Sequence, residues 1–441
     1  MEKSLTTLVE EAGIVGAGGA GFPSHVKYNA KAEYVIINGA ECEPLLRVDQ
    51  QLMASEADKI LQALQLIVEH VGAKAGYIAL KRKYHRAEEA LSERISSYPS
   101  CKIHFLDNFY PAGDEQVIVY EVTKRIVPEG GLPLNVGVIV TNVETALNVY
   151  EAYTNQKPVT EKYLTVTGEV ASQITVKVPL GITVKEAIDL AGGVTVKDFK
   201  VINGGPMMGK LISVDEVITK TVKGLIVLPA NHSLITSLTK EVSSMMREAR
   251  TACMHCSLCT EVCPRGLLGH RLEPHKLIRI PSYGKMCDSN TTAVHAFLCC
   301  GCRLCEYACV QDLQPWKMNA ILKSELLNQG IRNNLNLQPD KAAMFREYKK
   351  YPVNKLISKL GLAKYDKPAP IIVSEKAFQT VTIPFRQHVG APSEPVVKVG
   401  VTVQKGDLVA KISEGKLGSN IHASISGVVT AVTNENIRIQ M

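Results

Sequence analysis

Long apolar runs are missing from this sequence of 441 residues. A helix that crosses a bilayer needs about 18 or more consecutive apolar residues, and the best candidates here, VGVIV and GLIVLP, have only the length of a strand. The first residues, MEKSLTTLVEEAG, carry acidic side chains where a secretion signal has an apolar core. We therefore expect a cytoplasmic protein without a transmembrane segment.

A strong charge of one sign is also missing. The formal net charge is +7 over the whole chain, and the basic residues do not gather in blocks. Nucleic-acid-binding proteins usually show a basic stripe or a recognisable module, so we expect no nucleic-acid partner. The hydrophobic share of 46% and the charged share of 21% are typical of globular proteins. A chain of this length is expected to form several small domains.

Cysteine is the residue type whose distribution is most informative. Ten of the 12 cysteines lie between Cys253 and Cys309. A disulfide framework would spread its cysteines through a short secreted chain. Clustering within a long chain indicates metal binding instead.

Eight of the clustered cysteines form two runs with the same spacing. One run is Cys253-x2-Cys256-x2-Cys259-x3-Cys263, and the other is Cys299-x2-Cys302-x2-Cys305-x3-Cys309. In bacterial ferredoxins this spacing lets three cysteines ligate one [4Fe–4S] cluster while the fourth ligates the other cluster. Two zinc sites are the alternative, but zinc does not need two complete runs of four. We therefore predict two clusters with crossed ligand sets: Cys253, Cys256, Cys259 and Cys309 for one, and Cys299, Cys302, Cys305 and Cys263 for the other.

Four cysteines lie outside these two runs. Cys300 is next to a predicted ligand and could substitute for one, but we expect it and Cys287 to be packed thiols. Cys42 and Cys101 are expected to be structural. None of the four is assigned to a cluster.

The remaining sequence divides into segments of different pattern. Up to about residue 156, apolar strands such as YVIIN and GYIALK alternate with helical stretches such as 52–72, which is typical of an α/β domain. A β-grasp-like pattern with a glycine-rich turn, GGPMMG, follows, and many short strands with glycine turns close the chain. We predict an α/β domain, a β-grasp-like module, a helical cysteine-rich domain, a connector and a small β-sandwich or barrel, at residues 1–156, 160–225, 235–330, 331–370 and 371–441.

A glycine-rich loop, GIVGAGGAGFP, lies near the N-terminus. Its G-x-G-x-x-G pattern at 16–21 matches the dinucleotide-binding turn formally, but such a turn follows a strand and opens a helix directly. Residues 5–12 are predicted to be helical, and Phe-Pro follows the last glycine, so this context is missing. Glu41 lies where a ribose-binding acid is expected, which leaves nicotinamide binding open. The successive N–H groups of the loop, with Lys27 nearby, favour a phosphate site.

Four motifs occur in an order that one protein family shares. They are the glycine loop with Lys27, NGAECEP from Asn38, YPAGDE from Tyr110 and TNVET from Thr141. Together they resemble the flavin site of the NADH-oxidising subunit of respiratory complex I, and more closely that of Rnf complex C subunits and propanediol-utilisation cobalamin reductases. The order of segments resembles the cobalamin reductase family over nearly the whole chain, whereas in Rnf C subunits the sandwich module usually comes first.

The resemblance implies a fold class: an α/β flavin domain, a β-grasp (SLBB) module, an α-helical double-[4Fe–4S] ferredoxin domain and a C-terminal all-β barrel-sandwich hybrid. It also implies that FMN is bound, with the glycine loop and Lys27 around its phosphate. Phe22 is expected to line the pocket where a nicotinamide ring stacks. Complex I has two acids after the Asn of the second motif, and this chain has Ala40-Glu41. The residues implied to bind FMN are Gly16, Gly18, Gly19, Lys27, Asn38, Glu41, Gly113, Asp114, Thr141 and Asn142.

Each of these residues also has a purely structural interpretation. Glycines commonly form turns, and acidic side chains are commonly solvated. Asn142 could cap the helix that is predicted to begin near Glu144. The shared order of four motifs is what favours the flavin site.

The expected cofactors together indicate electron transfer. A hydride carries two electrons, a [4Fe–4S] cluster accepts one, and FMN exchanges both. We therefore expect an NADH-dependent oxidoreductase in which no side chain acts as a general acid or base. The resemblance implies a transiently bound corrinoid as acceptor, with an adenosyltransferase and a shell protein of a bacterial microcompartment as partners. Two alternatives are an Rnf C-like electron-input subunit for another reductase, such as proline reductase, and a redox adaptor without catalysis.

Overall fold

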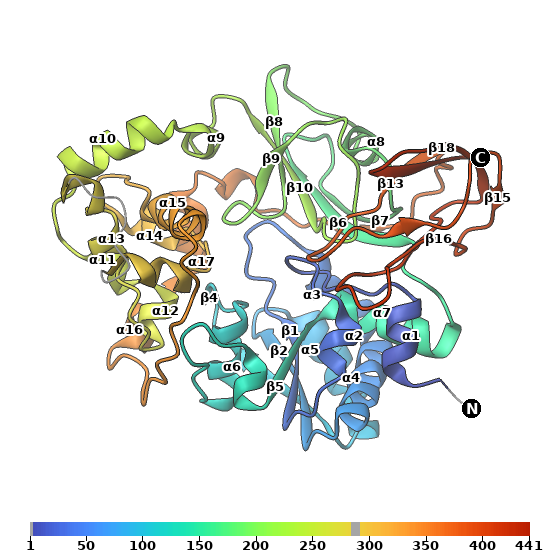
Figure 1. Ribbon diagram of the computed structural model, residues 1–441, viewed down its shortest axis with the longest axis horizontal. Coiled ribbons are helices and arrows are strands. Elements are labelled where there is room, and N and C mark those ends of the chain that lie inside the picture. The colour runs from blue at the N-terminus through green and yellow to red at the C-terminus, as the bar shows by residue number, and fades with distance from the viewer. Residues whose placement is uncertain (1–2, 284–291) are drawn as a thin grey trace.

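The computed structural model describes residues 3–283 and 292–441. It contains four bodies, and the cysteine-rich one and the C-terminal one lie on opposite sides of the other two (Figure 1). We call them the N-terminal module (α1 to α7, 5–155), the β-grasp module (β6 to β10, 161–229), the cysteine module (α9 to α15, 233–328) and the C-terminal module (β13 to β19, 380–440).

A parallel sheet forms the centre of the N-terminal module. Its strands, in spatial order, are β3 (Cys101–Leu106), β2 (Ala75–Lys81), β1 (Tyr34–Gly39) and β5 (Val138–Asn142). Successive side chains of β1 point to opposite faces, so Val35 and Ile37 join one core and Ile36 joins another. Both faces of the sheet are therefore covered, which explains the continuous apolar runs of these strands.

Helices pack on the two faces of this sheet. The helices α3, α4 and α7 supply the core that contains Val35, and α6 supplies the core that contains Ile36. The predicted helix at 52–72 is divided at Glu56, whose φ of −120° and ψ of 28° leave the helical region. The helices and the remaining short strand are α1 (Leu5–Glu11), α2 (Ser24–Tyr28), α3 (Val48–Ser55), α4 (Ala57–Val71), α5 (His85–Ser92), η1 (Ile95–Ser97), β4 (Phe109–Tyr110), α6 (Glu115–Thr123), η2 (Pro133–Val136) and α7 (Val143–Asn155).

The β-grasp module is a six-stranded sheet with one helix, α8 (Val184–Asp189). Thr183 and Glu186 form a capping box at the start of α8. The strands, in spatial order, are β12 (Ile371–Ile372), β7 (Ile174–Pro179), β6 (Glu161–Gly168), β10 (Gly224–Pro229), β8 (Phe199–Asn203) and β9 (Lys210–Ile212). The edge strand β12 comes from much later in the chain than the others.

Two small antiparallel sheets form the C-terminal module. One has the order β13 (Thr380–Pro384), β19 (Asn436–Gln440), β18 (Gly427–Val432) and β15 (Thr402–Val403), and the other has the order β14 (Glu394–Pro395), β16 (Leu408–Lys411) and β17 (Ile421–His422). The apolar side chains of this module share one core cluster with those of the β-grasp module. The two modules therefore share one core.

The cysteine module consists of short helices. Several of them have only four residues. The helices are α9 (Ser233–Thr239), α10 (Val242–Ala252), α11 (Leu258–Glu261), α12 (Pro264–Leu267), α13 (Pro274–Leu277), η3 (Ile280–Tyr283), η4 (Thr292–Leu298), α14 (Leu304–Ala308) and α15 (Pro315–Asn328).

The segment predicted as a connector contains structure of its own. It includes α16 (Arg346–Lys349), β11 (Tyr351–Pro352), α17 (Val353–Lys359) and η5 (Ala363–Tyr365), and β11 pairs with β4 of the N-terminal module. The domain boundaries themselves remain predictions.

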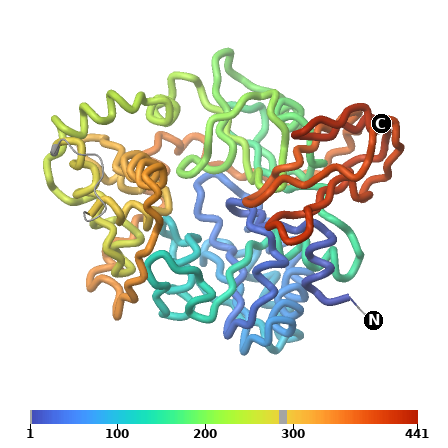
Figure 2. Tube along the Cα trace, viewed as in Figure 1, coloured from blue at the N-terminus to red at the C-terminus, as the bar shows by residue number. Residues whose placement is uncertain are grey.

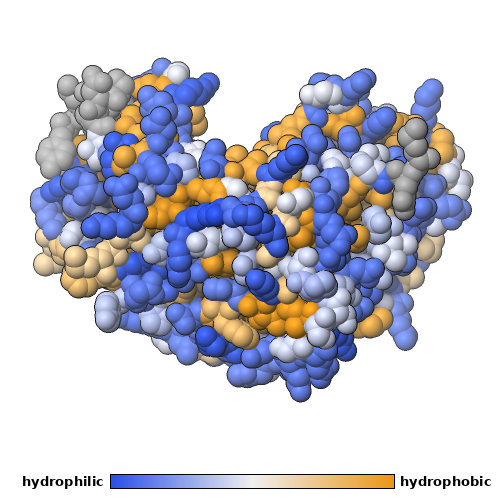
Figure 3. Space-filling view, turned by 90° about the horizontal axis from the view of Figure 1, so that it is seen from below, coloured by the Kyte–Doolittle hydropathy of each residue, from blue (hydrophilic) through white to orange (hydrophobic). Residues whose placement is uncertain are grey.

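The C-terminal module lies beside the first segments of the chain (Figure 2). The N–H of Val389 donates to the carbonyl of Ala20 at 3.2 Å, and the Asn420 side chain donates to the carbonyl of Glu10 at 3.3 Å. The C-terminal module therefore touches the glycine loop. On the face seen from below in Figure 1, hydrophilic side chains surround patches of apolar ones (Figure 3). Among the described helices, none is long and apolar enough to cross a membrane.

Candidate functional site

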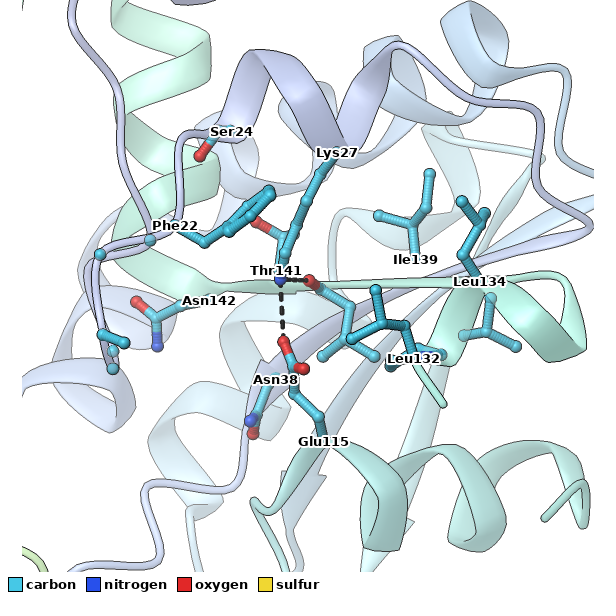
Figure 4. A pocket seen from close by; sticks show the side chains of 18 of the residues that line it. Phe22, Ser24, Lys27, Asn38, Glu115, Leu132, Leu134, Ile139, Thr141 and Asn142 are labelled. Carbon is cyan, nitrogen blue, oxygen red and sulfur yellow. Dashed lines mark hydrogen bonds and ion pairs between the residues drawn. The ribbon is translucent and has the colours of Figure 1, made fainter. Parts of the chain in front are cut away.

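A cavity of about 470 Å³ opens at the carboxyl ends of β1 and β5 (Figure 4). This is the end of a parallel sheet at which ligands usually bind, and the volume suits a small organic ligand. Nine of the residues implied to bind FMN or nicotinamide line it: Gly16, Gly18, Gly19, Phe22, Lys27, Asn38, Gly113, Thr141 and Asn142. The structure thus brings together parts of four motifs that are far apart in the sequence.

An apolar wall of the cavity has no counterpart among the predicted residues. Leu132, Leu134 and Ile139 lie together on one side, opposite Phe22 (Figure 4). The leucines are largely exposed despite their size. Such a wall suits the flat face of an aromatic ligand. The sequence gives no local signal for it, because an exposed leucine is also common away from binding sites.

The glycine loop offers unpaired donors to the cavity. Among the described residues, the backbone N–H groups of Gly18 and Gly19 donate no hydrogen bond. The neighbouring Ala17 N–H is instead bound to Thr145 Oγ1 at 2.9 Å. Unpaired N–H groups beside a cavity form a nest for an anion, and the chemistry of this loop therefore fits a phosphate group.

Lys27 brings a cation to the same cavity. Its Nζ lies 2.8 Å from Glu115 Oε1 and 3.0 Å from the carbonyl of Val140, so the Lys27 and Glu115 side chains point toward one another (Figure 4). Both side chains remain partly exposed to solvent. Glu115 was not predicted as a site residue, although it ends the YPAGDE motif. The pair supplies one positive and one negative group to a ligand.

Three polar side chains are fixed at the strand ends. Asn38 Nδ2 donates to the carbonyl of Gly113 at 2.8 Å, and the Thr141 hydroxyl lies 2.9 Å from the hydroxyl of the buried Tyr28. Asn142 Oδ1 accepts the N–H of Glu144 at 3.0 Å and so caps α7. Asn142 therefore has the structural role of a cap and also lines the cavity.

Two acids that the resemblance implies as flavin contacts do not line the cavity. Glu41 accepts the N–H groups of Asp49 and Gln50 at 2.8 and 3.3 Å, at the start of α3. Asp114 caps α6 and receives both terminal nitrogens of Arg265, at 2.7 and 2.9 Å. Their oxygens hold the backbone and a neighbouring module, and direct contact of these two carboxylates with FMN stays a prediction.

Buried lysines of the β-grasp module reach the same loops from behind. Lys223 Nζ lies 2.5 and 2.6 Å from the carboxylate of Asp49, which also accepts Asn142 Nδ2 at 3.0 Å. Lys162 pairs with Glu144 and donates to the carbonyl of Ala17 at 3.2 Å. Sequence reasoning missed these residues, because Lys223 and Asp49 are 174 residues apart and Lys162 and Ala17 are 145 residues apart, so no local pattern links them.

The first predicted cysteine group surrounds a small cavity in the cysteine module. All four of its members line this cavity, including Cys309 from the second run. Burial raises the pKa of Cys259 to about 12, and the thiols of Cys309, Cys253 and Cys256 add to this effect. The structure therefore brings together the crossed set Cys253, Cys256, Cys259 and Cys309.

The second predicted group lies deeper and includes Cys263 from the first run. Burial raises the pKa of Cys305 well above its ordinary value, and the nearby thiols of Cys299 and Cys263 contribute. The side-chain hydrogen bond with Cys300 and burial raise the pKa of Cys302 well above its ordinary value, and the thiols of Cys263 and Cys305 add to this effect. No group of three His, Cys, Asp or Glu among the described residues could hold a single metal ion. The thiols are instead arranged in two sets of four.

The deeper cysteine group contacts the N-terminal module. The Tyr110 hydroxyl lies 3.0 Å from the carbonyl oxygen of Cys302 and 3.1 Å from Glu43 Oε1. Arg265, two residues after Cys263, forms the bidentate pair with Asp114. Gly113, next to Asp114, lines the large cavity. The Asp114–Arg265 pair therefore connects the wall of the cavity with the second cysteine group.

The cysteines outside the two groups are packed as expected where the structure describes them. Cys101 is buried in the N-terminal core, and Cys42 lies beside Gly113 and packs in the core that also contains Cys302. Cys300 is half-buried between Arg265 and Cys302. Cys287 lies outside the described residues.

Four family models match successive segments of the chain. They are the Nuo51 FMN-binding domain at 9–151, the SLBB domain at 163–211, the 4Fe-4S dicluster domain at 252–314 and the RnfC barrel sandwich hybrid domain at 364–440. The predicted fold class is confirmed. The cofactors are FMN and iron–sulfur clusters, and the zinc alternative is wrong.

Two of the relatives match nearly the whole chain, and a third matches part of it. The chain is 43% identical to "Cobalamin reductase PduS" of Citrobacter freundii over 99% of this chain and 96% of the relative. It is 44% identical to "Cobalamin reductase PduS" of Salmonella typhimurium over 98% of this chain and 95% of that one. The identity to the C component of the Na(+)-translocating ferredoxin:NAD(+) oxidoreductase complex of Acetobacterium woodii is 36%, over 59% of this chain and 58% of the relative.

Proposed function

The chain belongs to the family of the cobalamin reductases PduS, and on this premise we propose that it oxidises NADH and delivers the electrons to a corrinoid. It is an oxidoreductase that uses FMN and iron–sulfur clusters. The observation that carries the proposal is that a cavity with an anion nest and two sets of four cysteines occur in one chain. FMN, when bound, accepts the two electrons of a hydride and can release them singly to clusters that accept one.

The residues around the cavity are suited to bind FMN. The unpaired N–H groups of Gly18 and Gly19 would hold its phosphate. Asn38 and Thr141, fixed by Gly113 and Tyr28, would orient the polar part of the ligand. The apolar wall around Leu132 and Leu134 excludes water from one face. Lys27 and Glu115 then complete the polar rim.

The two cysteine sets are suited to hold one [4Fe–4S] cluster each. Cys253, Cys256, Cys259 and Cys309 form the outer set, and Cys263, Cys299, Cys302 and Cys305 form the inner set. The inner set is buried against the N-terminal module, whereas Cys256 of the outer set is exposed. We propose that the inner set serves the flavin side and that the outer set serves the acceptor.

The proposed corrinoid, adenosyltransferase and shell-protein partners rest on the family alone. We propose that the corrinoid docks transiently and that an adenosyltransferase receives the reduced corrinoid. A location inside a bacterial microcompartment, in contact with a shell protein, belongs to the same proposal. The PduS name of the relatives supports this interpretation.

An Rnf C-like role is the second candidate. The Rnf-type relatives match about 60% of this chain, whereas the PduS relatives match 98–99%. The C-terminal position of the barrel sandwich hybrid, at 364–440, also agrees with the order expected for cobalamin reductases. The extent of the match therefore favours the corrinoid as acceptor.

The test is anaerobic turnover of the full chain with NADH and hydroxocobalamin. We expect loss of NADH absorbance together with formation of reduced cobalamin, and we expect Lys27→Glu to abolish both because it places an acid beside the anion nest. Lys185→Met, which changes an exposed lysine of the β-grasp module, serves as the control and should leave turnover unchanged. Protein with full flavin and iron content that oxidises NADH with a dye but never reduces cobalamin would favour the Rnf C-like role.

A further inference from the structure

The glycine loop is held from behind by a lysine of another module. Lys162, in the first strand of the β-grasp module, donates to the carbonyl of Ala17 at 3.2 Å. Its side chain is only 2% exposed, and it is not among the residues that line the cavity. Ala17 is buried as well, whereas its neighbour Gly18 lines the cavity. The lysine therefore contacts the loop outside the cavity, at the residue before Gly18.

Because the peptide unit is planar, the contact of Lys162 with the Ala17 carbonyl also sets the direction of the Gly18 N–H. Among the described peptide bonds the only cis bond is Tyr110-Pro111, so the bond between Ala17 and Gly18 is trans. In a trans peptide the C=O and the N–H point in opposite directions. A carbonyl of Ala17 that is bound to Lys162 behind the loop turns the Gly18 N–H toward the cavity. This N–H is one of the two donors that have no acceptor within the described protein.

The contacts of Lys162 fix it in place. Its Nζ forms an ion pair with Glu144, whose other oxygen accepts the N–H of Tyr163 at 3.0 Å. The Ala17 N–H is held by Thr145 Oγ1, next to Glu144 on α7. Both backbone groups of Ala17 are therefore bound on the side away from the cavity. Because Glu144 neutralises Lys162, the lysine contributes alignment rather than net charge.

We propose that Lys162 is a positioning residue of the phosphate nest, acting through the Ala17 carbonyl on the N–H of Gly18. This inference rests on the proposed function, because the nest is assigned there to the phosphate of FMN. It gives the β-grasp module a part in flavin recognition, although none of its side chains lines the cavity. The predicted consequence is selective: a ligand with a phosphate depends on Lys162, and the same ligand without a phosphate does not.

The test compares FMN with riboflavin, which lacks the phosphate. Lys162→Met alone would leave Glu144 charged and unpaired in the interior, so the main variant is Lys162→Met with Glu144→Gln. Binding to the full chain, with its clusters in place and its flavin removed, is measured by quenching of flavin fluorescence. We expect FMN to bind at least about tenfold more weakly than to the parent protein, as for loss of a hydrogen bond to a charged group. Riboflavin affinity should stay unchanged.

Matched variants separate positioning from stability. Lys177→Met, at an exposed lysine paired with Glu161 on the neighbouring strand, should change neither affinity. Thr145→Val leaves the buried ion pair intact but frees the N–H of Ala17, and it should weaken FMN binding without weakening riboflavin binding. This variant keeps the test valid if the double variant does not fold, as judged by its iron content.

The outcomes distinguish this inference from the function on which it rests. If both test variants keep the parent protein's preference for FMN over riboflavin, Lys162 does not position the nest. If both variants lose affinity for FMN and for riboflavin to the same extent, the substitutions loosen the whole binding site, and the proposed role is overturned as well. If the parent protein itself shows no preference for FMN, the proposed phosphate nest fails and not only the role of Lys162.

Discussion

The two cysteine sets have the same spacing but different surroundings. In the outer set Cys256 is exposed, and its neighbours Met254 and Val310 are 65% and 57% exposed. In the inner set Cys302 and Cys305 are each only 7% exposed. Equal spacing therefore does not mean equal roles. Cys259 of the outer set is also buried and Cys299 of the inner set is half-buried, so the difference lies at Cys256 and its neighbours, where the outer set reaches the surface.

The enclosure of the inner set comes from the N-terminal module. The Asp114–Arg265 pair and the contact of Tyr110 with the Cys302 carbonyl connect the cavity wall to the inner ligand loops. Burial raises the pKa of Glu43, which lies against Tyr110, so this contact is formed in a dry environment. The inner set is consequently expected to exchange electrons with the flavin, and the outer set with the acceptor.

Among the variants that test the difference between the inner and outer cysteine sets, Arg265→Met is expected to have the largest effect. The variant leaves the nearly buried carboxylate of Asp114 without its partner, which costs about 3–5 kcal/mol of stability. The thermal midpoint of the anaerobic protein should fall, and NADH-driven reduction of the clusters should slow because the two modules separate. Thermal unfolding and stopped-flow absorbance measure the two effects.

Lys185→Met provides the comparison for Arg265→Met. It removes an exposed i,i+4 pair with Asp189, and such pairs contribute about 0.3–0.5 kcal/mol. Equal stability of the two variants would show that the Asp114–Arg265 pair does not join the modules.

A smaller effect on the flavin side is expected from Gly18→Ala. A Cβ at this position would lie 2.9 Å from Asn142 Nδ2 and 3.1 Å from its Cγ, so Asn142 must move. Overpacking of this kind costs about 1–3 kcal/mol, which corresponds to roughly tenfold weaker FMN binding in a fluorescence titration. Gly16 also lines the cavity, but the nearest atoms to a Cβ there are at 3.7 Å, so Gly16→Ala adds the same methyl group without crowding and gives the comparison. Similar affinities of the two variants would contradict the predicted crowding.

The smallest expected effect concerns the side of the molecule farthest from the cysteines. Burial lowers the pKa of His422 to about 3, and the charge of Lys220 adds to this shift. Between pH 7.5 and 5.5 the unfolded chain binds a proton at this residue and the folded protein does not, so folding is destabilised as the pH falls. This group alone should account for a loss of about 1.4 kcal/mol.

His422→Asn should remove that part of the pH dependence. Anaerobic urea unfolding of both proteins at the two pH values measures it. A variant whose stability falls with pH as steeply as that of the parent protein would contradict the assignment to His422.

The sequence predicted those features whose signals are local. The cysteine runs are defined by ligand spacing, and the strands YVIIN and GYIALK by continuous apolar residues. The same spacing predicted that Cys263 and Cys309 each join the set formed by the other run. In the structure each lies with the set predicted for it. Nine lining residues of the cavity were found through the shared order of four motifs, and no single motif would have been enough to identify them.

The features that escaped prediction depend on contacts between distant segments. Glu41 and Asp114 lie within the expected motifs, but the starts of α3 and α6 and the guanidinium of Arg265 take up their oxygens. Lys162 and Lys223 gave no signal, because their partners belong to another module. The break of the predicted helix at Glu56 likewise depends on how α3 and α4 pack, and not on a proline or glycine.

The most direct test of the central claim compares Cys256→Ser with Cys305→Ser, each of which removes one ligand from one set. Anaerobic samples are reduced with NADH alone, and electron paramagnetic resonance reports whether the remaining cluster is reduced. The account predicts that NADH reduces the remaining inner cluster in Cys256→Ser and leaves the remaining outer cluster oxidised in Cys305→Ser. Reduction of the outer cluster in Cys305→Ser, with an oxidised inner cluster in Cys256→Ser, would contradict it.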